Sequence, residues 1–210
     1  MKYFDRNFCE LEDDPTLSES AINEYSAAVA YWQDQVARYF EQHPTAPRNH
    51  PIKADLGRAV GRLGEALRFA GRFSEALEYK QRALAIWEEL DRSRAIVLAR
   101  LRLAVILDQL GRGSEALAIL HALRERIPNS VPNRDAANPD NANSNANPND
   151  YEVYADFIHE ALALAYVRQG NFKAALPELD AALCIRLERG RENMITRSRE
   201  LSRRVEALAK

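Results

Sequence analysis

A short phrase that begins with glycine occurs three times along the chain. The copies start at Gly71 (GRFSEALEYKQRALAI), Gly111 (GRGSEALAILHALRERI) and Gly170 (GNFKAALPELDAALCI). Helix-type apolar periodicity precedes and follows each glycine, so each copy predicts a helix, a tight turn and a second helix. Glycine suits such a turn because it adopts left-handed dihedrals without a Cβ clash. Repeated helix pairs bury their apolar faces by stacking on one another, so the phrase predicts an all-helical repeat array.

Small residues also stand where two helices would cross. Gly64 lies seven residues before Gly71, in the middle of the first predicted helix, where glycine costs about 1 kcal/mol relative to alanine. Ala76 and Ala83 share one face of the next helix. We therefore predict close packing between antiparallel helices at these positions.

Between the second and third copies stands a segment of different composition. Residues 128–150 (PNSVPNRDAANPDNANSNANPND) consist almost entirely of Asn, Pro, Ala, Asp and Ser. Such a segment cannot offset its ordering entropy by burying apolar surface. We predict a solvated Asn/Pro-rich insertion loop, which accounts for the longer step from Gly111 to Gly170.

The copies resemble tetratricopeptide repeats (TPRs), whose signature is a small residue in the first helix, a glycine turn, an aromatic residue two positions later and two spaced alanines. The first copy carries Leu63, Gly64, Gly71, Phe73, Ala76 and Ala83, and the third carries Leu162, Ala163, Tyr166, Gly170, Phe172, Ala175 and Ala182. The second copy is degenerate, with Gly113 in place of the turn aromatic and Leu123 in place of the second alanine. Its 40-residue step is similar to that of the longer-helix repeats of kinesin light chains. The resemblance implies a right-handed α-solenoid of about three antiparallel helix pairs.

The rest of the chain extends the array at both ends. We predict an acidic tail over 1–17, an amphipathic helix and loop over 18–50, two repeats over 51–127, the third over 151–190 and a capping helix over 191–210. The helix within 18–50 has an apolar stripe of Ile22, Tyr25, Val29, Trp32, Val36 and Phe40. The stripe either docks on the first repeat as a cap or forms the seam of a homodimer. In the capping helix we expect Leu201, Val205 and Leu208 to face inward.

Residues with catalytic or metal-binding chemistry are scattered. The four histidines show no metal-ligand spacing, and His159 is expected to be a buried, hydrogen-bonded residue. Cys9 and Cys184 lie far apart and form no CxxC motif, which favours a reducing compartment. There is no phosphate-binding glycine loop, nucleophile motif, signal-like start or membrane-length apolar run. We therefore predict a cytoplasmic protein that is not an enzyme, binds no metal or cofactor and makes no membrane contact.

Charge gives no global signal for nucleic acid, because the net charge is -2 and the pI is about 6.1. Arginines are nevertheless concentrated in 186–210, where glutamates are interleaved with them. We interpret this segment as a helix with surface ion pairs. An acidic or nucleic-acid partner is the alternative.

In the family that the copies resemble, the first helices of successive repeats line a concave groove that holds a peptide. Carried over residue by residue, that groove is lined by Arg58, Arg62, Glu65, Arg68, Phe69, Leu98, Leu101, Arg102, Val105, Asp108, Phe157, Glu160, Leu164 and Arg168. The family's carboxylate clamp is absent, because Gly61 and Glu65 stand where the clamp has lysine and asparagine.

The function implied is a non-catalytic module that binds a peptide or protein segment in this groove. We expect Leu101 and Leu164 to supply apolar contact area and Arg62 and Arg102 to orient acidic residues of the partner. One alternative is a ligand-responsive regulatory or sensor protein that uses the same groove. Nucleic-acid binding through the arginine-rich C-terminal helix is a weaker alternative.

Overall fold

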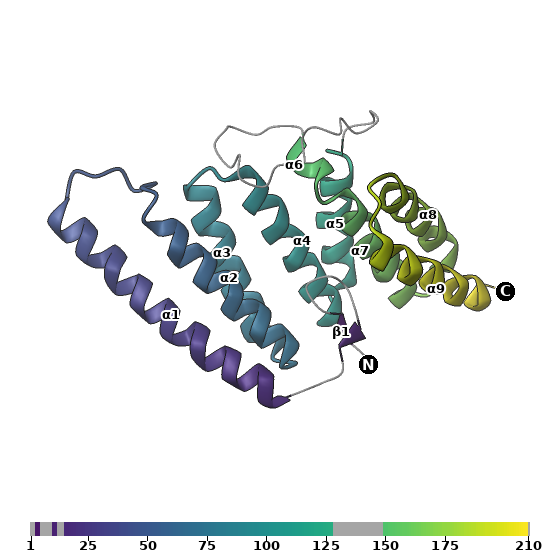
Figure 1. Cartoon of the computed structure of the whole chain (residues 1–210), viewed down its shortest axis with the longest axis horizontal. Helices are drawn as coiled ribbons and strands as arrows, with labels where there is room; N and C mark the ends of the chain where they lie inside the picture. Colours follow the sequence, from purple (N-terminus) through teal and green to yellow (C-terminus); the bar gives the residue numbers. More distant parts are fainter. Residues whose placement is uncertain (1–2, 5–9, 12–14, 128–148, 210) are drawn as a thin grey trace. The chain divides into compact units, whose positions relative to one another are not determined.

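The computed structural model describes residues 3–4, 10–11, 15–127 and 149–209. The chain divides into two compact units, Met1–Ile106 and Leu107–Lys210. Apart from the antiparallel pair of two-residue strands β1 (Tyr3–Phe4) and β2 (Glu10–Leu11), all regular structure in the described residues is helical (Figure 1). The all-α class predicted from the repeated phrase is therefore confirmed.

The first unit is built around the first repeat. It contains α1 (Pro15–Gln42), α2 (Lys53–Phe69), α3 (Phe73–Glu89) and most of α4 (Ser93–Gln109), which continues into the second unit. α2 packs against both α1 and α3. The side chains packed between α2 and α3 are almost completely buried. They include Val60, Leu63, Leu67, Ala76 and Ala83.

The glycine turns have the predicted left-handed geometry. Gly71 has a φ of 74°, and the N–H of Arg72, one residue later, donates to the carbonyl oxygen of Leu67 at 2.9 Å. The same closure follows Gly111 and Gly170. A residue with a Cβ would be strained at this φ, which explains why the repeated phrase starts with glycine.

Close packing accounts for Gly64. A Cβ at this position would lie 3.2 Å from Cγ of Lys80 and 3.3 Å from the carbonyl oxygen of Ala76. Both atoms belong to α3, so the missing side chain lets α3 approach α2. This is the helix contact that the spacing of small residues predicts.

The apolar stripe of α1 faces the first repeat. Ile22 and Val29 are buried, Trp32, Val36 and Phe40 are half-buried, and α1 packs along α2. Within the first unit the stripe therefore already has a covering surface. This arrangement favours the cap over the dimer seam.

The second unit contains α5 (Gly113–Arg124), α6 (Asn149–Glu152), α7 (Ala155–Arg168), α8 (Phe172–Glu188) and α9 (Glu192–Leu208). α7 packs against α5 and α8, and α8 packs against α9. Ala163, Ala175, Leu179 and Val205 form a fully buried apolar cluster that joins α7, α8 and α9.

Two details of the second unit differ from the repeat pattern. Gly113 stands where the repeat pattern has an aromatic residue after the turn. The side chain of Gln169 lies beside this position, because its Nε2 would be 2.7 Å from a Cβ at Gly113. Leu208 is 60% exposed and does not face inward as we expected, whereas Val205 is buried. The helix end carries Leu208 past the packed surface. The predicted insertion loop lies outside the described residues, except for residues 149 and 150.

Candidate partner-binding face and the charged clusters beside it

The predicted groove residues lie on three helices. Arg58, Arg62 and Phe69 are on α2, Leu98 to Val105 are on α4, and Phe157 to Arg168 are on α7. The first two sets belong to the first unit and the third set belongs to the second.

Within the first unit, α2 and α4 present neighbouring faces. Arg102 Nη1 of α4 lies 3.6 Å from Glu65 Oε1 of α2. Leu98 and Val105, four residues before and three after Arg102, share its side of α4 and are half-buried. We name this surface the α2–α4 face: Arg58, Arg62, Phe69, Leu98, Arg102 and Val105.

Leu101 does not belong to the α2–α4 face. Its side chain is only 1% exposed, so the expected contact area in the groove is absent there. The run of apolar residues around it explains the error: Val97, Leu103, Ala104 and Ile106 are also buried, and α4 turns most of its circumference inward.

The predicted arginines differ in their availability. Arg62 is exposed and makes no ion pair or hydrogen bond with the described residues, whereas Arg58 is paired with Asp55. Arg102 is 12% exposed and pairs with Glu65, so it is not free to orient a partner as we expected. In the second unit Arg168 pairs with Asp108, and burial lowers the pKa of Arg168.

The aromatic residues of the predicted groove are engaged by cations of the same unit. The guanidinium of Arg68 lies 4.3 Å from the ring centroid of Phe69. Those of Arg186 and Arg191 lie 5.7 and 5.4 Å from the ring centroid of Phe157. Leu164 remains half-buried on α7.

Beneath the α2–α4 face is a buried charged group that we name the Glu65 cluster: Glu65, Arg68, Lys80 and Arg102. Arg68 donates from Nε and Nη2 to Glu65 Oε1 at 3.2 and 2.8 Å, and Lys80 Nζ lies 2.9 Å from Oε2. Lys80 Nζ also donates to the carbonyl oxygen of Gly61 at 2.7 Å. The single carboxylate of Glu65 thus contacts cations from three helices, α2, α3 and α4.

The pKa values in the Glu65 cluster follow from burial and charge. Burial acts to raise the pKa of Glu65, but the charges of Lys80, Arg102 and Arg68 outweigh it and hold that pKa well below its ordinary value. Burial lowers the pKa of Lys80, and the carboxylate of Glu65 opposes this shift.

The sequence reasoning missed Lys80, although it named Glu65 and Arg68. Lys80 lies on the face of α3 that includes Ala76 and Ala83, and all three are buried. A lysine between two small buried residues was a usable signal. Its aliphatic stem packs over Gly64 while its ammonium reaches the carbonyl of Gly61.

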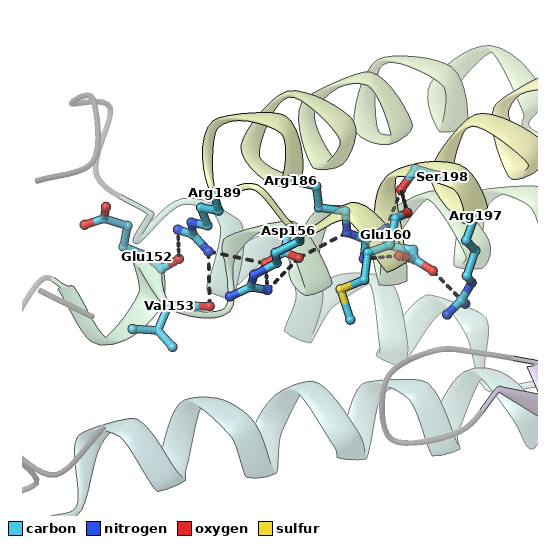
Figure 2. Close-up of polar contacts among 10 residues, drawn as sticks. Glu152, Val153, Asp156, Glu160, Arg186, Arg189, Arg197 and Ser198 are labelled. Atoms are coloured by element: carbon cyan, nitrogen blue, oxygen red, sulfur yellow. Dashed lines mark hydrogen bonds and ion pairs between the residues drawn. The ribbon is translucent and has the colours of Figure 1, made fainter. Parts of the chain in front are cut away.

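A second buried charged group joins α7, α8 and α9 in the second unit (Figure 2). Arg186 of α8 donates from Nε to Asp156 at 3.1 Å, pairs with Glu160, and donates from Nη1 to Ser198 Oγ of α9 at 2.5 Å. Arg197 of α9 donates to the other oxygen of Glu160 at 2.8 Å. Asp156, Glu160 and Arg186 are each at most 1% exposed.

Two further arginines complete this network. Arg191 donates to both oxygens of Asp156, at 3.0 and 2.9 Å. Arg189 donates to Asp156 and to the carbonyl oxygens of Val153 and Glu152. Burial raises the pKa of Glu160 despite the opposing charges of Arg186 and Arg197, and burial lowers the pKa of Arg189. These contacts fasten α9 to α7, so this group is structural.

The surface role that we interpreted for the arginines of 186–210 holds for Arg203 and Arg204 but not for Arg186 and Arg197, which pair with the buried Glu160. Arg203 and Arg204 pair with Glu200 at 3.2 and 2.9 Å, and both are exposed. His159 is also hydrogen-bonded as expected, through Nδ1 to Glu178 at 2.6 Å.

Comparison with known proteins gives a family match for part of the chain. Residues 55–126 match the tetratricopeptide repeat family. The resemblance is thereby confirmed for this stretch. Two crystal structures of nearly identical TPR-like repeats from a candidate kinesin light chain of Podosopora anserina, one a single-substitution variant, are also similar. They share 17% and 18% sequence identity with this chain, cover 93% and 92% of it and 94% and 92% of their own lengths, and each has a TM-score of 0.49.

No curated protein matches this chain. Among the described helices, none has the length and apolar character needed to cross a membrane. The described residues also contain no group of three or more His, Cys, Asp or Glu side chains that could hold a metal ion.

Proposed function

We propose that this chain is a non-catalytic protein-interaction module whose α2–α4 face binds a segment of a partner protein. The observation that carries the proposal is that Arg62, on the first helix of a stretch that matches the TPR family, is exposed and has no ion pair with the described residues. In this family, that helix supplies the peptide-binding groove.

The chemistry of the face indicates the kind of partner. Leu98, Val105 and Phe69 are half-buried and can add apolar contact area, while Arg62 can donate two hydrogen bonds to one carboxylate. We therefore propose a partner segment that combines aliphatic or aromatic anchors with acidic residues. We also propose a cytoplasmic location, on the grounds that the two cysteines lie far apart and have no redox or metal motif.

The test is affinity capture from cytosol followed by measurement of the captured partner's affinity. Arg62→Glu should weaken binding about tenfold or more, because it places like charges against the acidic segment, and should leave the melting curve nearly unchanged. Arg38→Glu, at an exposed position on α1, is the matched control and should bind as the parent does. Equal affinity of Arg62→Glu and the parent would exclude the α2–α4 face.

A further inference from the structure

The Glu65 cluster buries more positive charge than its carboxylate can balance. Arg68 and Lys80 are 1% and 7% exposed, and both are paired with Glu65. Among the described residues, Glu65 is the acidic side chain that stabilises the charge of Lys80, while Arg68 and Arg102 oppose it. Two buried cations thus share a single negative charge before Arg102 is counted.

One end of the Arg68 guanidinium has no partner among the residues that the structure describes. Nε and Nη2 donate to Glu65 Oε1, whereas Nη1 is buried and forms no hydrogen bond with those residues. A buried donor on a charged group that lacks a partner is costly, since the group has lost its water without gaining a replacement. The fixed position of Arg68, stacked over Phe69, leaves this donor in place for an acceptor.

The cluster reaches the surface at the α2–α4 face. The side chains of Glu65 and Arg102 are 16% and 12% exposed, whereas Arg68 lies at the buried end. An acceptor that enters beside Glu65 and Arg102 would approach Arg68. It would also meet the positive charge that Glu65 leaves unbalanced.

We infer that the Glu65 cluster binds one oxyanion, a carboxylate or a phosphate group, with Arg68 Nη1 as the donor that completes its hydrogen bonding. The inference rests on the proposed function in taking this oxyanion as part of the bound segment. It names a receiving site beneath the face, distinct from the exposed Arg62. An oxyanion there supplies both the missing acceptor and the missing negative charge.

The first experiment uses inorganic phosphate and the full-length protein. The melting temperature is measured at pH 7 in increasing sodium phosphate, against sodium chloride at the same ionic strength. Binding to the folded state alone should raise the melting temperature by a few degrees once phosphate exceeds its Kd about tenfold. No rise beyond that in chloride overturns the inference.

Variants test whether any rise in the melting temperature with phosphate comes from the Glu65 cluster. Arg68→Met removes the unpaired donor at similar volume and should abolish the rise, while leaving the melting temperature without phosphate unchanged or higher, because an unbalanced buried charge is removed. Arg38→Met, at an exposed position on α1 outside the α2–α4 face, is the control and should keep the rise. A phosphate response that survives Arg68→Met contradicts the assignment.

Glu65→Gln gives a second readout of opposite sign. Removing the carboxylate increases the positive excess, so phosphate should produce a larger rise than in the parent, from a lower starting melting temperature. If the Glu65 cluster only holds α2, α3 and α4 together, Glu65→Gln should lower the melting temperature without phosphate but should not increase the rise that phosphate produces. That outcome would overturn the inference even if Arg68→Met does not fold.

A pair of blocked peptides identifies the source of the oxyanion. Calorimetry compares acetyl-Leu-Glu-Leu-Glu-Leu-amide with its glutamine counterpart. Preference for the glutamate peptide that is lost in Arg68→Met identifies a side-chain carboxylate, and a response to phosphate alone identifies a phosphate group. If partner capture proves independent of Arg62 while the phosphate response persists, the proposed function fails and the oxyanion site stands.

Discussion

The repeat pattern predicts the small residues on either side of Lys80 but does not predict that Lys80 itself belongs to the site. The pattern predicts that Ala76 and Ala83 pack against α2, and both are buried. Lys80 lies between them on the same face, and its burial follows from the glycines opposite, which leave room for its stem and a carbonyl for its ammonium. Small residues can be recognised from the sequence, but the partner that fills the space they leave depends on the helix crossing.

The packing at Ala76 gives the first prediction at this scale. Ala76 is fully buried against α2, so Ala76→Leu should lower the free energy of unfolding by about 1 to 3 kcal/mol through overpacking. Glu78→Ala, on the exposed side of α3, should change it by less than about 0.5 kcal/mol. Urea denaturation of both variants measures the difference. Equal effects would contradict the orientation of α3.

At the scale of elements, helix order was predictable and inter-helix polar contacts were not. The periodicity places the glycine turns and the helix pairs, because these depend on local sequence. The network of Asp156, Glu160 and Arg186 joins residues about 30 positions apart and appears in the sequence only as charges on helices. Arg197 was accordingly interpreted as part of a surface helix, yet it holds a buried glutamate.

A polar link between α5, α7 and α8 gives a pH-dependent prediction. Glu178 of α8 accepts from Arg124 Nη1 of α5 at 2.5 Å and contacts His159 Nδ1 of α7 at 2.6 Å. Burial acts to raise the pKa of Glu178, but the hydrogen bonds and charges of His159 and Arg124 outweigh it, and the pKa is lowered. A carboxyl whose pKa is lowered on folding adds stability above its unfolded pKa and loses it as the pH falls through the folded pKa.

Glu178→Gln should therefore lower the free energy of unfolding by about 1 to 3 kcal/mol at pH 5.5. The difference in the free energy of unfolding between parent and variant should become smaller as the pH falls below about 4.3, the ordinary pKa of glutamate. Urea denaturation from pH 5.5 to pH 3 measures this difference. The control is Glu125→Gln at the exposed position that follows the last residue of α5, and this variant should follow the parent throughout. A difference independent of pH would show that the charge of Glu178 contributes nothing.

At the scale of the whole molecule, the sequence predicts the class of fold and the turns better than the binding surface. The match over 55–126 and the helices that make up the regular structure of the described residues from 15 onward agree with the three repeated phrases. The groove residues carried over from the family were only partly available, because Leu101 is buried and Arg102 and Arg168 have ion-pair partners. Repeat register locates a residue on a helix, whereas its exposure depends on every neighbour that packs there.

The insertion between the second and third repeats gives the last prediction. The long helices α5 and α7, which flank it together with the four-residue helix α6, pack directly on each other, and His121 Nε2 of α5 lies 3.0 Å from the hydroxyl of Tyr166 of α7. The connection therefore need only span this contact, and loop-closure entropy changes slowly with loop length. Replacing 133–147 with a short Gly/Ser linker should keep the melting temperature within a few degrees of the parent. A scrambled sequence of the same composition is the control for length. A fall of about ten degrees with the linker, but not with the scrambled sequence, would show that loop length holds α5 and α7 together.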